Sequence, residues 1–313
     1  MPSATHSTID LADGAKMAYE ILGSQYLGVR QPLVLIGGMS SRRIDWERLA
    51  TSIADVRPVL LFDHRGMGDS KLSPGNDETI SIELLARDLL FLLEHLQWNE
   101  LSLCGFSMGG VVAQQLLFLP FHRTKPTPLP FRVTHGILAG TLCSVLRDKR
   151  FGLRVNKDAP SGQLTLEQKR EIARPTLAST FDPTWIANSA NSERFEWWLN
   201  RMITGGRPTS VILSQGRALN RIDFDGYHDR LSRDIQFLVI HGKLDEVVPF
   251  YCGQEILQRI PWAKMVKIGE APGQVESYAF GHHWFEYFDI RVWHEVVERF
   301  LGDSKNTSQP ARL

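Results

Sequence analysis

The sequence predicts an α/β fold, in which helices flank a mainly parallel central sheet that is interrupted by a helical insertion. Two observations indicate the sheet. Short apolar runs alternate with segments of helical periodicity, and each run stops at Gly, Asp or a polar turn, as buried parallel strands do. The insertion is indicated by a break in this rhythm between residues 144 and 231. We expect strands at residues 17–22, 32–38, 57–63, 101–106, 134–140, 235–242 and 264–269.

The elements before and after the break have their own signals. The first expected strand follows the pair Asp13-Gly14, which favours a hairpin turn. Residues 81–96 predict an amphipathic helix that lies on the sheet, because six apolar residues form one stripe: Ile82, Leu85, Leu89, Leu92, Leu93 and Leu96. A similar stripe near the end of the chain predicts the last helix: Trp293, Val296, Val297, Phe300 and Leu301.

Residues 144–231 lack long apolar runs and are typical of helices joined by polar turns. Thr165 and Gln168 have the spacing of a capping box, which predicts a helix that begins there. Pro183 is suited to open a second helix, which would carry Trp185, Phe195, Trp197 and Trp198. We therefore expect one core made of residues 1–143 and 232–303, a helical lid at 144–231, and a flexible tail at 304–313.

Composition excludes several classes of protein. The chain has 313 residues, of which 43% are hydrophobic and 22% charged, values that suit a globular protein with a sizeable core. Its formal net charge is zero, which argues against nucleic acid or an anionic membrane surface as a partner. No apolar stretch approaches the length of a membrane-spanning helix, so no stable membrane insertion is expected. The histidines lack ligand spacing, and the sequence gives no sign of a metal or cofactor site.

The cysteines and the chain ends bear on location. Three scattered cysteines, Cys104, Cys143 and Cys252, fit free thiols in a reducing compartment better than a disulfide framework. The N-terminal residues show no secretory signal, so a cytoplasmic protein is expected. The chain ends in Ala311-Arg312-Leu313, which resembles the Ser-Lys-Leu peroxisomal signal and leaves peroxisomal delivery as the alternative.

A Gly-x-Ser-x-Gly pattern places Ser107 where an expected strand turns into an expected helix. A serine hydroxyl is a weak nucleophile unless a base takes its proton, and an acid improves the orientation of that base. Both partners follow later expected strands: Asp245 comes after residues 235–242, and His282 and His283 follow the last strand. The order along the chain is therefore Ser, Asp, His.

With these residues in view, the sequence resembles the α/β-hydrolase fold superfamily, in which a helical lid covers a serine on a nucleophile elbow. The resemblance rests on five segments in the family's order: residues 33–46, 60–70, 104–110, 241–249 and 281–286. It implies Ser107 as nucleophile, Asp245 as acid and His282, which directly follows Gly281, in preference to His283 as base. It also implies that the backbone N–H groups of Met39 and Met108 form the oxyanion hole.

One difference from many relatives is that Gly37-Gly38 stands where they have His-Gly, which changes how the loop carrying Met39 is braced. The conspicuous residues of 63–70, among them Asp63 and Arg65, are interpreted as shaping a turn. The insertion supplies candidates for an apolar substrate pocket, or alternatively for packing within the lid itself: Trp185, Trp197, Trp198 and Met202.

The function implied by the resemblance is hydrolysis of a carboxylic ester, lactone or thioester of a hydrophobic small molecule, without a cofactor. Two alternatives remain open. The same triad serves carbon–carbon bond hydrolases of the diketone type and perhydrolases, because function lies in the pocket and not in the fold. A ligand-binding receptor of this fold that does not turn over is the second alternative. The sequence does not indicate the oligomeric state.

Overall fold

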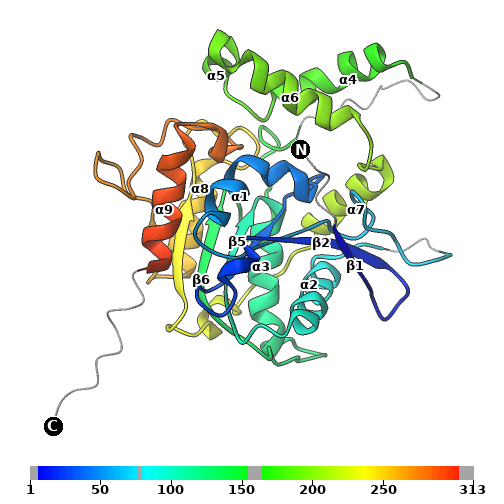
Figure 1. Ribbon diagram of the computed structural model, residues 1–313, viewed down its shortest axis with the longest axis vertical. Coiled ribbons are helices and arrows are strands. Elements are labelled where there is room, and N and C mark those ends of the chain that lie inside the picture. The colour runs from blue at the N-terminus through cyan, green and yellow to red at the C-terminus, as the bar shows by residue number, and fades with distance from the viewer. Residues whose placement is uncertain (1–5, 76–78, 154–163, 303–313) are drawn as a thin grey trace.

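A computed structural model describes residues 6–75, 79–153 and 164–302 of the chain (Figure 1). These residues form one sheet of eight strands in the order β1-β2-β4-β3-β5-β6-β7-β8. The pairs β1–β2 and β2–β4 are antiparallel, and all other neighbours are parallel. The strands are β1 Ser7–Asp10, β2 Lys16–Leu22, β3 Leu33–Ile36, β4 Val59–Phe62, β5 Glu100–Phe106, β6 Arg132–Ala139, β7 Gln236–Ile240 and β8 Lys264–Met265.

Helices cover both faces of this sheet, as the apolar runs of the central strands require. One core cluster joins the sheet to α2 (Ile82–Leu96), α3 (Met108–Phe118) and α8 (Phe250–Arg259). A second cluster joins the opposite face to α1 (Glu47–Ala54) and α9 (Ile290–Gly302). Successive residues of β3 enter the two clusters in turn, because neighbouring side chains of a strand point to opposite faces. The predicted α/β architecture is confirmed.

Most predicted elements are present, and two differ from the expectation. Ser81 caps α2 by accepting the N–H of Leu84, and Thr165 and Gln168 form the capping box of α4 (Leu166–Ala178). The helix expected from Pro183 is instead two helices, α5 (Pro183–Ala187) and α6 (Ser192–Ile203), because the Asn188 side chain accepts the N–H of Ala190 and the chain turns there.

The last expected strand is also shorter than predicted. β8 ends at Met265, and the following residues fold back on themselves, since Lys267 and Val275 are joined by a backbone hydrogen bond of 2.9 Å. A sheet edge with only one neighbouring strand imposes little on the residues beyond it.

Between β6 and β7 the regular elements of the described residues are all helical. α4, α5 and α6 form a separate layer at the top of Figure 1, and α7 (Thr209–Leu219) lies lower, beside α2. The division of the chain at residues 144 and 231 stays a prediction. The expected tail at 304–313, with its Ala311-Arg312-Leu313 ending, lies outside the described residues. Among those residues, none of the helices has both the length and the apolar character to cross a membrane.

Close backbone contacts fix the turn between β5 and α3. A Cβ atom at Gly105 would lie 2.5 Å from the carbonyl oxygen of Gly109. A Cβ atom at Gly109 would lie 2.0 Å from the carbonyl oxygen of Ile36 at the end of β3. Only glycine allows β5, α3 and β3 to approach in this way, and the contact sets the position of the residue between the glycines, Ser107.

Replacing Gly109 with Ala should therefore destabilise the protein by about 3 kcal/mol or more, since backbone must move to relieve the overlap. Urea unfolding of the variant and of the wild type measures this difference. Gly302→Ala is the matched control and should leave stability nearly unchanged, because its Cβ meets nothing within 4 Å. Equal stabilities for Gly109→Ala and the wild type would contradict the packing described.

Candidate active site

Ser107 occupies the turn between β5 and α3 in a strained conformation. Its φ of 54° and ψ of −123° lie outside the regions that non-glycine residues ordinarily adopt. The surrounding structure holds it there, because its N–H donates to the Ala139 carbonyl at 2.9 Å and its carbonyl accepts the Thr141 hydroxyl at 2.6 Å. Strained backbone conformations of this kind cluster at functional sites, where a side chain must be held in one position.

Three residues predicted from the sequence meet at this turn. The Ser107 hydroxyl lies 3.1 Å from Nε2 of His282, and Nδ1 of the same ring lies 2.8 Å from Oδ2 of Asp245. The other carboxylate oxygen of Asp245 accepts the N–H groups of Val247 and Val248 at 2.9 and 2.8 Å. A carboxylate at Nδ1 favours the tautomer that carries its proton there, which leaves Nε2 able to accept the serine proton.

The neighbouring histidines have different surroundings. His283 is turned away from this chain of hydrogen bonds and stacks on Phe181, with ring centroids 4.9 Å apart. Burial lowers the pKa of His283 to about 3, so it is neutral at ordinary pH. His241 lies behind Asp245, with its Nε2 3.6 Å from the carboxylate, and donates to the Val248 carbonyl. The structure thus places His282, and not His283, beside Ser107.

The two backbone groups expected to form an oxyanion hole belong to Met108, which follows the serine in the chain, and to Met39, whose neighbour Gly38 lies against the serine. Met108 is the first residue of α3, so its N–H is one that the helix itself cannot bond. Met39 follows Gly38, where a Cβ atom would lie 3.0 Å from the Cβ of Ser107. Within the described ranges, the N–H of Met39 has no hydrogen-bond acceptor. N–H groups without a partner are the kind of donor that can stabilise a developing negative charge.

The loop that carries Met39 is braced by side chains that no sequence pattern indicated. His64 donates from Nε2 to the Gly37 carbonyl at 3.0 Å. Gln215 of α7 accepts the N–H of Ser40 at 2.9 Å, and Arg207 donates to the Ser40 carbonyl. The latter two lie more than 160 residues away along the chain, so no local pattern could have identified them.

A small cavity of about 80 Å³ lies beside the loop of Met39. Of the four predicted pocket residues, Trp198 and Met202 line it, and Trp185 and Trp197 do not. Trp185 stacks on Phe181 with ring centroids 4.1 Å apart, and Trp197 lies between the guanidinium groups of Arg194 and Arg201. The other lining residues are Met39, Ser40, Ser41, Asp45, Trp46, Phe106, Leu153, Thr176, Leu177, Thr180, Arg207, His283 and Phe285.

A buried carboxylate ties the helical layer to the segment that carries His282. The Glu286 side chain is fully buried and accepts two hydrogen bonds from Arg194 of α6, at 2.6 and 2.8 Å. It also accepts the indole N–H of Trp198 at 3.0 Å and a guanidinium N–H of Arg48 at 3.2 Å. Removal of one partner of such a buried ion pair typically costs about 3–5 kcal/mol. Sequence reasoning missed this residue, whose side-chain partners come from two distant helices, α1 and α6.

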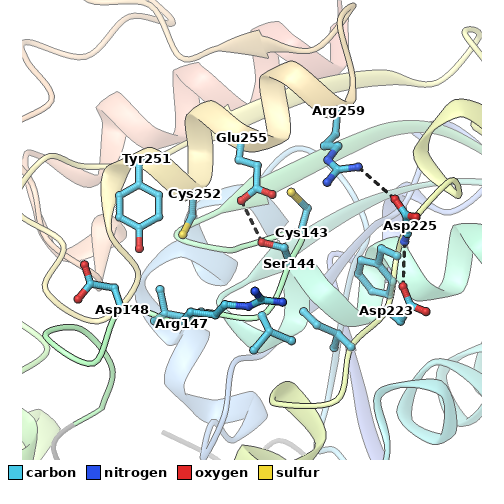
Figure 2. Close-up of a pocket in the computed structure, with 14 residues that line it drawn as sticks. Cys143, Ser144, Arg147, Asp148, Asp223, Asp225, Tyr251, Cys252, Glu255 and Arg259 are labelled. Atoms are coloured by element: carbon cyan, nitrogen blue, oxygen red, sulfur yellow. Dashed lines mark hydrogen bonds and ion pairs between the residues drawn. The ribbon is translucent and has the colours of Figure 1, made fainter.

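A larger cavity of about 530 Å³ lies between α8 and the segment after β6 (Figure 2). Glu255 points into it from α8 and accepts the Ser144 hydroxyl at 3.0 Å. Burial raises the pKa of the two thiols that line it, Cys143 and Cys252, to about 12, so neither ionises near neutral pH. None of the described residues that line it is a histidine. Among the described residues, this cavity therefore lacks the histidine and acid pair that accompanies Ser107.

No group of three or more His, Cys, Asp or Glu side chains is placed to hold a metal ion in residues 6–75, 79–153 and 164–302. The polar groups beside Ser107 instead form a linear chain of hydrogen bonds from hydroxyl to imidazole to carboxylate. Such a chain can move a proton from the serine to the imidazole and stabilise the imidazolium that results.

The chain is similar over most of its length to known hydrolases. A putative carbamate hydrolase of Caulobacter segnis is 24% identical over 298 residues, 94% of this chain and 98% of its own length. A 3-oxoadipate enol-lactonase of Acinetobacter baylyi is 27% identical over 232 residues, 74% of this chain and 78% of its own. The crystal structure of a hydrolase from Pseudomonas aeruginosa has a TM-score of 0.71 at 23% identity, covering 96% of this chain and 99% of that one.

The model of one protein family, described as the alpha/beta hydrolase fold, matches residues 31–271. The match extends from just before β3 to just after β8 and so includes the Ser107 turn and the Asp245 loop. The chain therefore belongs to the alpha/beta hydrolase fold family and is a hydrolase of that fold.

Proposed function

We propose that the protein is a serine hydrolase that cleaves a carboxylic ester, lactone or thioester of a hydrophobic small molecule through an acyl-enzyme. The observation that carries the proposal is the unbroken series of hydrogen bonds from Ser107 through His282 to Asp245. The names of the relatives support it, since a lactonase and a carbamate hydrolase both cleave a bond to a carbonyl carbon.

In the proposed reaction, His282 Nε2 takes the hydroxyl proton as Ser107 Oγ bonds to the carbonyl carbon. Asp245 stabilises the imidazolium, and the N–H groups of Met39 and Met108 bind the oxygen on which negative charge develops. The intermediate then expels the leaving group, which takes the proton from His282. Water repeats the sequence on the acyl-enzyme, releases the acid and returns the proton to Ser107.

We also propose that residues 144–231 form a lid, of which α4 to α6 cover the site and shape the acyl pocket. The cavity beside Met39 is lined largely by apolar and aromatic side chains, which supports a hydrophobic acyl group. Its volume of about 80 Å³ is well below the range of about 300–1,000 Å³ that is typical of drug-sized ligands. A short acyl chain is therefore the substrate feature that this cavity fits.

Ser107→Ala should lower kcat for p-nitrophenyl butyrate about 10⁴-fold or more, because the nucleophile is lost. Steady-state hydrolysis measured by p-nitrophenol absorbance checks this. Ser144→Ala, which changes a serine of the larger cavity, is the control and should retain wild-type turnover. Activity that survives in Ser107→Ala contradicts the proposal. A burst of one equivalent without steady turnover in the wild type supports the ligand-binding receptor instead.

His282→Gln should lower kcat by about 10²–10⁴-fold, since the amide cannot act as a base. His283→Gln should lower it less than about 10-fold, because His283 contributes no proton transfer and only packing is altered. The comparison of the two variants at pH 7.5 tests the assignment of the base. A larger loss in His283→Gln than in His282→Gln reverses it.

Met202→Ala should shift the preference among p-nitrophenyl acetate, butyrate and octanoate toward the longer chain, because the substitution enlarges the cavity. The ratio of kcat/KM for octanoate to that for acetate measures the shift, which we expect to be about 10-fold. Met265→Ala at the sheet edge removes the same side chain away from the cavity and should leave the ratio unchanged. An unchanged ratio in Met202→Ala excludes this cavity as the acyl site.

A further inference from the structure

The loop that carries Met39 contains a second strained residue. Ser40 has a φ of 66°, in the left-handed region that residues with a Cβ atom seldom adopt. It directly follows Met39, and its N–H belongs to the peptide group that joins the two residues. A change in the backbone angles of Ser40 would therefore displace Met39, whose own N–H lies on the preceding peptide group.

Both backbone groups of Ser40 are held by side chains from the helical insertion. Gln215 of α7 accepts its N–H at 2.9 Å, and Arg207, in the loop before α7, donates to its carbonyl. Arg207 is itself fixed by a buried pair with Asp45, whose carboxylate oxygens lie 2.7 and 2.9 Å from the same guanidinium nitrogen. The contacts on Ser40 are therefore directional and rigidly supported.

The hydrogen bond between Gln215 and the N–H of Ser40 is accompanied by a cost in folding free energy. The residue is fully buried, and its Nε2 has no hydrogen-bond partner among the residues that the structure describes. A buried polar group without a partner costs about 1–3 kcal/mol. An apolar side chain of similar size would avoid that cost, although it would leave the N–H of Ser40 unpaired. The energetics favour a role for Gln215 in positioning over a role in net stability.

The loop also lies against the serine. A Cβ atom at Gly38 would lie 3.0 Å from the Cβ of Ser107, so a small shift of the loop changes the distance between Met39 and the reacting carbon. Gly37 is held separately by His64 from the core. The two ends of the loop are therefore braced by different parts of the molecule, one by the core and the other by the insertion.

We propose that Gln215 and Arg207 are positioning residues, which hold Ser40 in its left-handed conformation and thereby keep Met39 in the place where its N–H binds the oxyanion. The insertion would then do more than cover the substrate, because it completes the site that stabilises the transition state. This inference rests on the proposed serine hydrolase function and identifies which residues outside the catalytic core that function needs.

The test uses Gln215→Met, which keeps the side-chain volume and removes the acceptor for Ser40. We expect kcat to fall about 10- to 100-fold, somewhat less than for loss of a whole oxyanion donor, and KM to change less than about 2-fold. The melting temperature should stay within about 2 °C, because the loss of one hydrogen bond is offset by removal of the orphaned amide.

Two companion variants separate positioning from packing. Ser40→Gly in the Gln215→Met background should restore most of the lost kcat, since glycine adopts the left-handed conformation without steric cost. Gln114→Met is the control for stability: Gln114 is equally buried, but its amide donates to the carbonyls of Gly110 and Leu142. That variant should lose several degrees in melting temperature.

Inhibition by a transition-state analogue measures the binding strength of the oxyanion hole directly. An alkyl trifluoromethyl ketone forms a tetrahedral adduct with a serine nucleophile, and its oxygen occupies the hole. Its inhibition constant should rise in Gln215→Met by the same factor by which kcat/KM falls.

The proposal is overturned if Gln215→Met keeps wild-type kcat, if the inhibition constant is unchanged, or if Ser40→Gly restores nothing. These outcomes differ from failure of the proposed function, in which the wild type itself does not turn over or Ser107→Ala remains active.

Discussion

The close packing of backbone on backbone at the end of β5 is the constraint on which the site depends. Gly105, Gly109 and the carbonyl of Ile36 approach within distances that no side chain would permit. This contact forces the chain to reverse at Ser107 and to enter α3 at once. It also brings the end of β3, and with it the loop of Met39, against the serine. A single steric requirement thus places the hydroxyl, the first N–H of α3 and the facing loop together.

The remaining parts of the site reach the serine along the sheet. β7 and β8 end at the same edge of the sheet as β5, because parallel strands bring their carboxyl ends together. Asp245 and His282 therefore arrive from residues far apart in the chain. The two N–H groups that Asp245 accepts from Val247 and Val248 hold its carboxylate in one orientation. The imidazole of His282 is oriented in turn by its hydrogen bond to this carboxylate, so its ring has little freedom to rotate beside the serine.

The sequence was most informative where chemistry and local geometry coincide. Apolar runs that stop at turns predicted the strands, and three residues that follow these runs, Ser107, Asp245 and His282, meet in the structure. Trp197 shows the limit of such reasoning, because a helical aromatic pattern does not say which side faces a cavity and which faces arginines. The break between α5 and α6 depends on one Asn side chain. The roles of Gln215 and Glu286 could not be predicted from the sequence for a different reason. Each role depends on hydrogen-bond partners that are distant in the chain and come close only in the folded protein.

The buried Glu286 limits the construction of chimeras in which the helical insertion of this enzyme is exchanged for that of another hydrolase. Its carboxylate belongs to the segment of His282, whereas most of its donors belong to α6 of the insertion. A chimera that received the insertion of another hydrolase without equivalents of Arg194 and Trp198 would leave a negative charge in the interior with Arg48 as its remaining ionic partner. The insertion is therefore not an interchangeable module, and grafting for a new specificity would have to transfer or neutralise this charge together with the helices.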